Sequence, residues 1–313
     1  MFLTCFSCLN FAFANDVNGT DNVLTDSVSV NGNSFADIQN SINSANSGDT
    51  IKLNANTYVG NGTQIIVNKS LTFDGTGSDG SKAVLDANDS SRIFYISGNY
   101  SVVFKNIIFQ KARVNSAGCV IYQTTGNALT LTDCDIKNCY NRFTSNMNGY
   151  LIKGATYSNI QLSRVNVFNV SANSTRYIDG FFISAPNYSK VRIDDFNFYN
   201  NLLYSMCPAS HSSSGAIVFG AAYGQFSGKN ICLRNNTFIC NGALGGLGFY
   251  TGQYSRVNVS GLKYEENYFE SFRSESYSCG VYAGKNSVVD LNNVNFTKNQ
   301  FISKTYASSI IIY

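Results

Sequence analysis

Five charged residues fall on neighbouring copies of a repeated strand pattern and could form a polysaccharide-cleaving site. Calcium-dependent cleavage of an acidic polysaccharide needs acids that ligate the metal and a nearby arginine that acts as the base. The candidates are Asp133, Asp135, Arg164, Arg192 and Asp194. The alternative, which we favour, is a solvated cluster in which these acids and bases pair with one another. We therefore predict no catalytic residue and keep an enzyme as the less favoured hypothesis.

Two further sets of residues are weaker candidates for catalysis. Asp194 and Asp195 are adjacent acids, and glycoside hydrolysis uses two carboxylates that face one groove. The strand pattern, however, places Asp194 towards solvent and Asp195 in a bend. The single histidine, His211, lies in a serine-rich connection with no acid beside it in the sequence. No catalytic triad can be assembled around it, so neither set predicts a reaction.

The cysteines predict neither a zinc site nor a complete disulfide framework. Once Cys5 and Cys8 are removed with an N-terminal leader, an odd number of cysteines remains, and none of these forms a Cys-x-x-Cys pair. We expect most of the others to be small core residues with free thiols. They are Cys119, Cys134, Cys139, Cys207, Cys232, Cys240 and Cys279. We expect no metal and no cofactor.

The composition excludes several classes of protein. Only 13% of the 313 residues are charged and the net charge is +3, which is too weak a field to hold nucleic acid or an anionic membrane. A hydrophobic share of 44% argues against disorder. No run reaches the roughly 18 apolar residues of a membrane-spanning helix. We therefore expect a folded protein without a membrane-spanning segment or a nucleic-acid partner.

The first residues indicate export. Residues 2–13 are mostly apolar and Ala12-Phe13-Ala14 is a small-x-small cleavage site, although no Lys or Arg precedes Lys52. This pattern predicts a signal peptide at residues 1–14, followed by a linker at 15–33. Asn-x-Ser/Thr glycosylation triplets recur along the chain, which is compatible with a secreted surface. We expect an extracellular or cell-surface location.

An internal repeat is the most informative feature of the chain. Apolar residues recur at positions 1, 3, 6 and 8 of seven segments, with a two-residue break between the pairs and one polar exception at Asn236. A glycine opens a short apolar strand ahead of most copies. The segments are 102–109, 129–136, 160–167, 191–198, 231–238, 257–264 and 289–296. Alternation with period two and a repeat of about 30 residues predict an all-β fold, a parallel β-helix solenoid of about eight coils.

The break between the paired apolar positions predicts a ladder of bend residues. Its members are mostly Asn, Asp or Gly, which tolerate a left-handed backbone conformation. The predicted bend ladder is Asn106, Asp133, Arg164, Asp195, Asn235, Gly261 and Asn293. We expect these residues to be structural first.

The glycine-led strands predict an outward apolar stripe that could bind a ligand. Stacked coils would align its members, and aromatic rings suit sugar faces or a partner protein. The predicted binding residues are Tyr122, Leu151, Phe182, Phe219, Tyr250 and Tyr282. The alternatives are that neighbouring connections cover this stripe, or that the strand parity is reversed.

The N-terminal part of the repeat resembles a known family. Ser34 can cap a short helix whose apolar face holds Phe35, Ile38 and Ile42, and Gly-Asp-Thr-Ile and Asn-Thr-Tyr segments follow. This opening resembles the N-terminal cap of right-handed parallel β-helix proteins of the pectin-lyase-like superfamily, so the resemblance implies a right-handed solenoid. Together with the Asn-rich repeats it is most similar to adhesin-like surface proteins of methanogenic archaea. The resemblance covers 34–313, but the Gly-His-Gly and Arg-Ile-Lys signatures of polygalacturonase-like enzymes are absent.

The resemblance implies a secreted, cell-surface repeat protein, usually without demonstrated catalysis. We expect an adhesin-like protein that binds carbohydrate or a cell-surface protein through outer faces and loops. A polysaccharide lyase or hydrolase and a passive envelope spacer remain alternatives. The chain stops at Ser308–Tyr313, which matches the start of another coil, so we expect the domain at 34–313 to be truncated at its C-terminal end.

Overall fold

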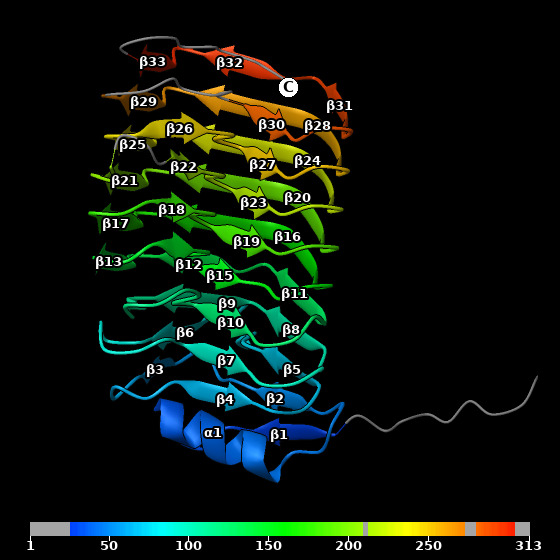
Figure 1. The fold of residues 1–313 in the computed structure, drawn as a ribbon. Helices are drawn as coiled ribbons and strands as arrows, with labels where there is room; N and C mark the ends of the chain where they lie inside the picture. The colour runs from blue at the N-terminus through cyan, green and yellow to red at the C-terminus, as the bar shows by residue number, and fades with distance from the viewer. Residues whose placement is uncertain (1–25, 209–211, 273–279, 304–313) are drawn as a thin grey trace, which may run out of the picture.

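The computed structural model describes residues 26–208, 212–272 and 280–303, which wind into a parallel β-solenoid of about eight turns (Figure 1). Every strand pair in the four sheets is parallel, because each strand lies against its counterpart in the next coil. The expected all-β class and repeat are thereby confirmed. The predicted signal peptide, His211, Cys279 and the last residues fall outside the described residues.

The largest sheet contains both halves of the repeated pattern. It consists of β1 (Ser27–Ser29), β2 (Thr50–Lys52), β3 (Thr57–Val59), β5 (Leu71–Asp74), β6 (Ala83–Asp86), β8 (Val102–Lys105), β9 (Ile107–Gln110), β11 (Ala128–Thr132), β12 (Asp135–Lys137), β16 (Asn159–Phe168), β20 (Lys190–Tyr199), β24 (Gln225–Arg234), β28 (Arg256–Glu265), β31 (Val288–Asn292) and β32 (Asn295–Thr297).

Three smaller sheets complete each coil. The eight-stranded sheet holds short strands, most of which follow a glycine: β4 (Ile65–Val67), β7 (Phe94–Ile96), β10 (Ile121–Gln123), β15 (Ile152–Lys153), β19 (Ile183–Ala185), β23 (Val218–Gly220), β27 (Phe249–Thr251) and β30 (Val281–Ala283). A six-stranded sheet holds β13 (Tyr140–Phe143), β17 (Ser171–Ser174), β21 (Leu202–Ser205), β25 (Thr237–Cys240), β29 (Tyr268–Ser271) and β33 (Gln300–Ser303). The four-stranded sheet holds β14 (Met147–Asn148), β18 (Ile178–Asp179), β22 (Ser212–Ser214) and β26 (Ala243–Gly245).

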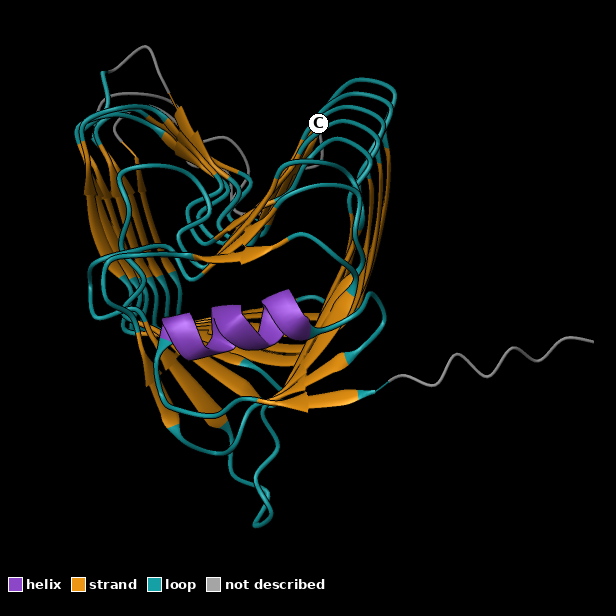
Figure 2. Cartoon of the chain, turned by 90° about the horizontal axis from the view of Figure 1, so that it is seen from below, coloured by secondary structure: helices purple, strands orange, loops and turns teal. Residues whose placement is uncertain are grey.

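The helix α1 (Phe35–Ser44) lies across the N-terminal end of the coils (Figure 2). Its Ser34 and Asp37 form a capping box, in which the Asp37 N–H donates to Ser34 Oγ and the Ser34 N–H donates to Asp37 Oδ2. Phe35, Ile38 and Ile42 are buried against the first coil, as the helical periodicity predicts. The solenoid begins before residue 34, because β1, within the predicted linker, pairs with β2.

Inward-facing columns fill the interior of the solenoid. Phe104 pairs with Leu131, Leu131 with Leu162, and Leu162 with Ile193, and all four side chains are buried. Residues about 30 apart in sequence thus lie directly above one another. Burial of these stacked side chains is the main contribution to the stability of such a solenoid.

One coil departs from the predicted register by five residues. Ile231 pairs with Phe196, so the first apolar pair of β24 is Phe226 and Gly228. When the pattern of positions 1, 3, 6 and 8 is shifted by five residues, its first two positions fall on its last two, so the sequence of this coil fits two registers. Because Gly228 has no side chain, the true first pair is not recognised in the sequence. A Cβ at Gly228 would lie 2.6 Å from the Ile193 carbonyl oxygen, which explains why a glycine stands there.

The register shift corrects one member of the predicted bend ladder. Asn230, not Asn235, occupies the bend in this coil, and the other six members lie where the pattern predicts. All seven bend residues have φ between 52° and 71°. The observed bend ladder is Asn106, Asp133, Arg164, Asp195, Asn230, Gly261 and Asn293. Asn235, with φ 51°, belongs to the next corner of the coil, which follows β24.

Candidate functional site

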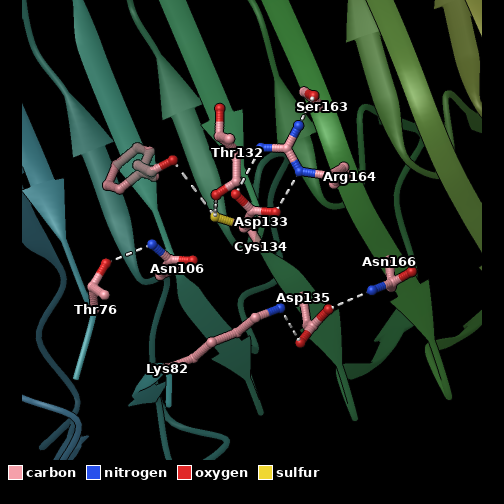
Figure 3. Close-up of polar contacts among 11 residues, drawn as sticks. Thr76, Lys82, Asn106, Thr132, Asp133, Cys134, Asp135, Ser163, Arg164 and Asn166 are labelled. Carbon is pink, nitrogen blue, oxygen red and sulfur yellow. Dashed lines mark hydrogen bonds and ion pairs between the residues drawn. The ribbon is translucent and has the colours of Figure 1, made fainter. Parts of the chain in front are cut away.

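The acid and base side chains from neighbouring coils pair with one another (Figure 3). Arg164 donates from Nε to Asp133 Oδ1 at 2.6 Å and from Nη2 to Asp133 Oδ2 at 2.8 Å. Asp135 accepts from Lys82 Nζ at 2.9 Å and from Asn166 Nδ2 at 2.7 Å. These contacts connect residues of three different coils, so the cluster ties the sheet together along the axis.

The electrostatics of this cluster are those of ion pairs. The bidentate hydrogen bond from Arg164 holds the pKa of Asp133 below its usual value, and Asp133 raises the pKa of Arg164 in return. Asp194 pairs with Arg192 of its own strand, with Nε to Oδ2 at 2.8 Å. Each of the three aspartates therefore already accepts from a cation. Among the described residues no group of three or more His, Cys, Asp and Glu is arranged to hold a metal ion.

The adjacent acids Asp194 and Asp195 do not face a common groove in the manner of paired catalytic carboxylates. Asp195 is a bend residue with φ 54°, and its Oδ1 accepts from Asn230 Nδ2 at 2.8 Å. Asp194 lies beside Arg192 in a hollow of about 260 Å³ on the outer face of the large sheet. The structure thus gives Asp195 the structural position that the bend pattern predicts.

The predicted outward stripe is placed correctly at four positions and wrongly at two. Leu151 and Phe182 are fully buried, and Lys153 and Ser184 stand in the column instead. In these two coils the left-handed glycine is followed by inward-pointing residues, so the outward position comes four residues after Gly149 and Gly180, not two. The observed column, called here the mixed column, is Tyr95, Tyr122, Lys153, Ser184, Phe219, Tyr250 and Tyr282.

Aromatic rings in the mixed column stack along the axis but are interrupted in the middle. Phe219 and Tyr250 lie 5.2 Å apart between ring centroids, and Tyr250 and Tyr282 lie 4.5 Å apart. Between the two aromatic groups, Lys153 Nζ donates to Ser184 Oγ at 3.0 Å, and burial lowers the pKa of this lysine. All the aromatic members are partly buried, so the column presents only part of each ring to solvent.

A second column of rings, called here the tyrosine ladder, is more exposed. It consists of Tyr157, Tyr188, Tyr223 and Tyr254, with centroid separations of 5.1, 4.9 and 5.2 Å and interplanar angles of at most 13°. Their exposed fractions are 67%, 45%, 43% and 49%. All four have positive φ, between 57° and 66°, at the corner where the eight-stranded sheet passes into the large sheet.

Sequence reasoning missed the tyrosine ladder, although a signal for it exists. Each tyrosine is followed by Ser or Gly and stands three residues before the first inward residue of a long strand, as Tyr157 stands before Ile160. Only the correct register of β24 brings Tyr223 into this series, because Phe226 is then the first inward residue.

The two ends of the tyrosine ladder differ. The backbone of Gly126 lies against Thr156 and Tyr157 and carries no side chain, so the outer face of the Tyr157 ring is the most open. At the other end Tyr223 and Tyr254 border a hollow of about 310 Å³. Its remaining lining residues are Gly224, Gln225, Ser255, Arg256, Asn286 and Val288.

A third aromatic group lies on the second half of the large sheet. Phe168 and Tyr199 stack at 4.9 Å, and the Arg234 guanidinium lies 5.6 Å from the centre of the Tyr199 ring. Tyr199 and Arg234 border a hollow of about 340 Å³ that Asn166, Asn197 and Cys232 also line. Both faces of the Tyr199 ring are covered, so this hollow offers polar groups rather than a free ring face.

The fold places the chain in the class of parallel β-solenoid proteins with outward aromatic columns. No protein-family model matches the chain, and no curated protein matches it. None of the described residues belongs to a helix long and apolar enough to cross a membrane.

Proposed function

We propose that this chain is a secreted, cell-surface adhesin-like protein that binds a linear glycan along its tyrosine ladder. The observation that carries the proposal is the exposure of four stacked rings on four consecutive coils. Exposed aromatic side chains are costly to leave in water without a use, and a contiguous group of them marks an interaction surface.

The repeat of the rings suits a ligand that also repeats. Neighbouring rings are separated by 4.9 to 5.2 Å, a distance comparable to the length of one sugar residue in an extended glycan. The stacked rings cover one another's faces, so the inner rings present their edges and hydroxyl groups. Tyr157, next to Gly126, keeps an open face on which a terminal sugar ring can stack.

The polar groups beside the tyrosine ladder are mostly hydrogen-bond donors. Two residues after each tyrosine, the next outward column holds Asn159, Lys190, Gln225 and Arg256. All but the half-buried Asn159 are exposed, and none of the four is an acid. Donors of this kind bind sugar hydroxyls, and the two cations would also favour a glycan that carries negative charge. The ladder therefore combines ring edges with a parallel row of donors.

The decisive experiment compares glycan binding by the full chain with binding by a Tyr188→Ser/Tyr223→Ser variant. On a glycan array followed by titration, we expect about tenfold weaker binding, because two ring contacts are lost. Oligosaccharides should bind more tightly as they lengthen to four sugars and gain less beyond that. Tyr140→Ser is the matched control, since Tyr140 is equally exposed, at 43%, but lies in β13.

Three outcomes would contradict the proposal. Unchanged binding by the folded double variant would remove the tyrosine ladder as the site. Calcium-dependent release of unsaturated products from an acidic polysaccharide would favour the lyase instead. Absence of both binding and cleavage across a broad array would favour a passive envelope spacer.

A further inference from the structure

Two cysteine side chains from adjacent coils touch in the interior of the solenoid. The Sγ atoms of Cys207 and Cys240 lie 3.4 Å apart, and both residues are fully buried. Cys240 ends β25 and pairs with Ser205 of β21, two residues before Cys207. The two cysteines are 33 residues apart in the sequence, and they meet because one coil stacks on the next.

We propose that Cys207 and Cys240 form a disulfide that cross-links neighbouring coils of the solenoid. A disulfide requires an S–S distance of about 2.05 Å and Cα atoms roughly 4.4 to 6.8 Å apart. The sheet pairs Cys240 with Ser205 and not with Cys207, so the 3.4 Å contact between the sulfur atoms is the observation that places the two cysteines within reach of each other. The two sulfur atoms need to approach by an amount on the order of 1 Å, which rotation about the two Cα–Cβ bonds can supply.

The oxidation requires a disulfide oxidant such as oxidised glutathione. The thiolate of one cysteine attacks a glutathione sulfur, so a mixed disulfide forms and one glutathione leaves as thiolate. The second cysteine then attacks the protein sulfur of the mixed disulfide and expels the other glutathione. In total two protein thiols lose two electrons and two protons, and one oxidised glutathione becomes two molecules of the thiol.

The surroundings of the pair determine when the cross-link forms. The hydrogen bond with Cys207 and burial both raise the pKa of the Cys240 thiol well above its usual value. Because the thiolate is the reactive form, the folded reduced protein should react slowly. The disulfide therefore forms while the coils close during folding. Once it has formed, the same burial protects it from reductants.

Two other cysteines serve as internal controls. Cys134 Sγ donates to the Thr132 carbonyl oxygen at 3.3 Å, and Cys232 lies on the outer face with its Sγ 4.0 Å from Glu265 Oε2. Burial and then the charge of Glu265 raise the pKa of Cys232. Neither has the sulfur contact that Cys207 and Cys240 share. If the contact between the sulfur atoms determines which cysteines form a disulfide, Cys134 and Cys232 should remain thiols.

The test is refolding of the full, reduced chain in a mixture of oxidised and reduced glutathione. After alkylation of the remaining thiols, non-reducing peptide mapping should show the Cys207 peptide linked to the Cys240 peptide, with Cys134 and Cys232 alkylated. The oxidised protein should melt at least roughly 5 °C above the same protein refolded with reductant. In Cys207→Ala this difference should disappear. Exposure of the reduced protein to the oxidant after folding should yield the link far more slowly.

Three results would overturn the proposal. They are alkylation of both cysteines after oxidative refolding, linkage of either to a different cysteine, and a bond confined to Cys119 and Cys139, which also interact with each other. The proposal rests on the proposed secretion only for its source of oxidant. A chain that forms the link but binds no glycan would overturn the proposed function and leave the cross-link standing.

Discussion

At the scale of single residues, charged side chains connect coils rather than perform chemistry. Asp86 is a further example, since it accepts from Gln110 Nε2 at 2.8 Å and Lys111 Nζ at 2.9 Å on the next coil. It also accepts from the Asn88 N–H at 2.8 Å. A carboxylate with three donors is stabilised in its ionised form. Its role is therefore the one that Asp133 and Asp135 play two coils further along the solenoid.

Replacement of Asp86 by Asn should lower stability in a pH-dependent way. Burial alone would raise the pKa of Asp86, but the hydrogen bonds from Lys111, Asn88 and Gln110 outweigh it, and the pKa lies below its usual value. A lowered pKa contributes stability that is present above about pH 3.9 and is lost as the pH falls through the folded-state pKa.

We therefore expect Asp86→Asn to lose about 1 to 2 kcal/mol at pH 7 and much less near pH 2. Urea unfolding at both pH values measures this difference. An equal loss at both pH values would show that the ionised carboxylate does not stabilise the coil.

At the scale of elements, the corners of the coils are held by columns of like residues. One such column consists of asparagines and is called here the asparagine ladder. Asn236 belongs to it, which explains why a polar residue stands where the apolar pattern expects an apolar one. The ladder is Asn201, Asn236, Asn267 and Asn299, each of which follows a residue with positive φ at the corner after the large sheet. The Asn236 amide accepts from Asn201 and donates to Asn267 Oδ1 at 2.9 Å and to the Phe198 carbonyl oxygen at 2.9 Å.

Asn236→Ala should be among the more damaging single substitutions. It removes these hydrogen bonds while Asn201 and Asn267 stay buried, so we expect a loss of about 2 to 4 kcal/mol in chemical denaturation. Asn197→Ala is the matched control, because Asn197 is exposed and donates to Asn166 Oδ1, and it should lose less than about 0.5 kcal/mol. An equal loss of stability in the two variants would mean that the buried asparagine ladder stabilises the fold no more than an exposed asparagine does.

At the scale of the whole molecule, each coil contacts mainly the coils above and below it. The interior residues of β16 and β20 are fully covered, whereas Val289, Leu291 and Phe296 in β31 and β32 are only half-buried. Stability in such an assembly is roughly a sum of coil and neighbour terms. The local stability should therefore differ from coil to coil along the axis.

Hydrogen–deuterium exchange should reveal this gradient. Amides of β16 and β20 pair with strands on both sides, and we expect them to exchange at least tenfold more slowly than those of β31 and β32. Peptide-level mass spectrometry of the full chain measures the rates. Uniform protection from 159 to 303 would instead mean that the solenoid opens as a single cooperative unit.

The sequence by itself determined the strands, the inward columns and most of the bend ladder. Period-two alternation and left-handed bend residues are local preferences, so Phe104, Leu131 and Asp133 could be placed without coordinates. The capping helix followed from the same kind of local signal at Ser34 and Phe35.

Only the tertiary structure decided which residues share a column where the pattern is ambiguous. In the coil containing Gly228 the apolar pattern fits two registers that differ by five residues, and pairing with β20 and β28 selects one of them. That choice moved the bend to Asn230 and completed the tyrosine ladder at Tyr223. Outward side chains lack the burial that fixes inward ones, so their alignment depends on the connections between strands, whose lengths vary from coil to coil.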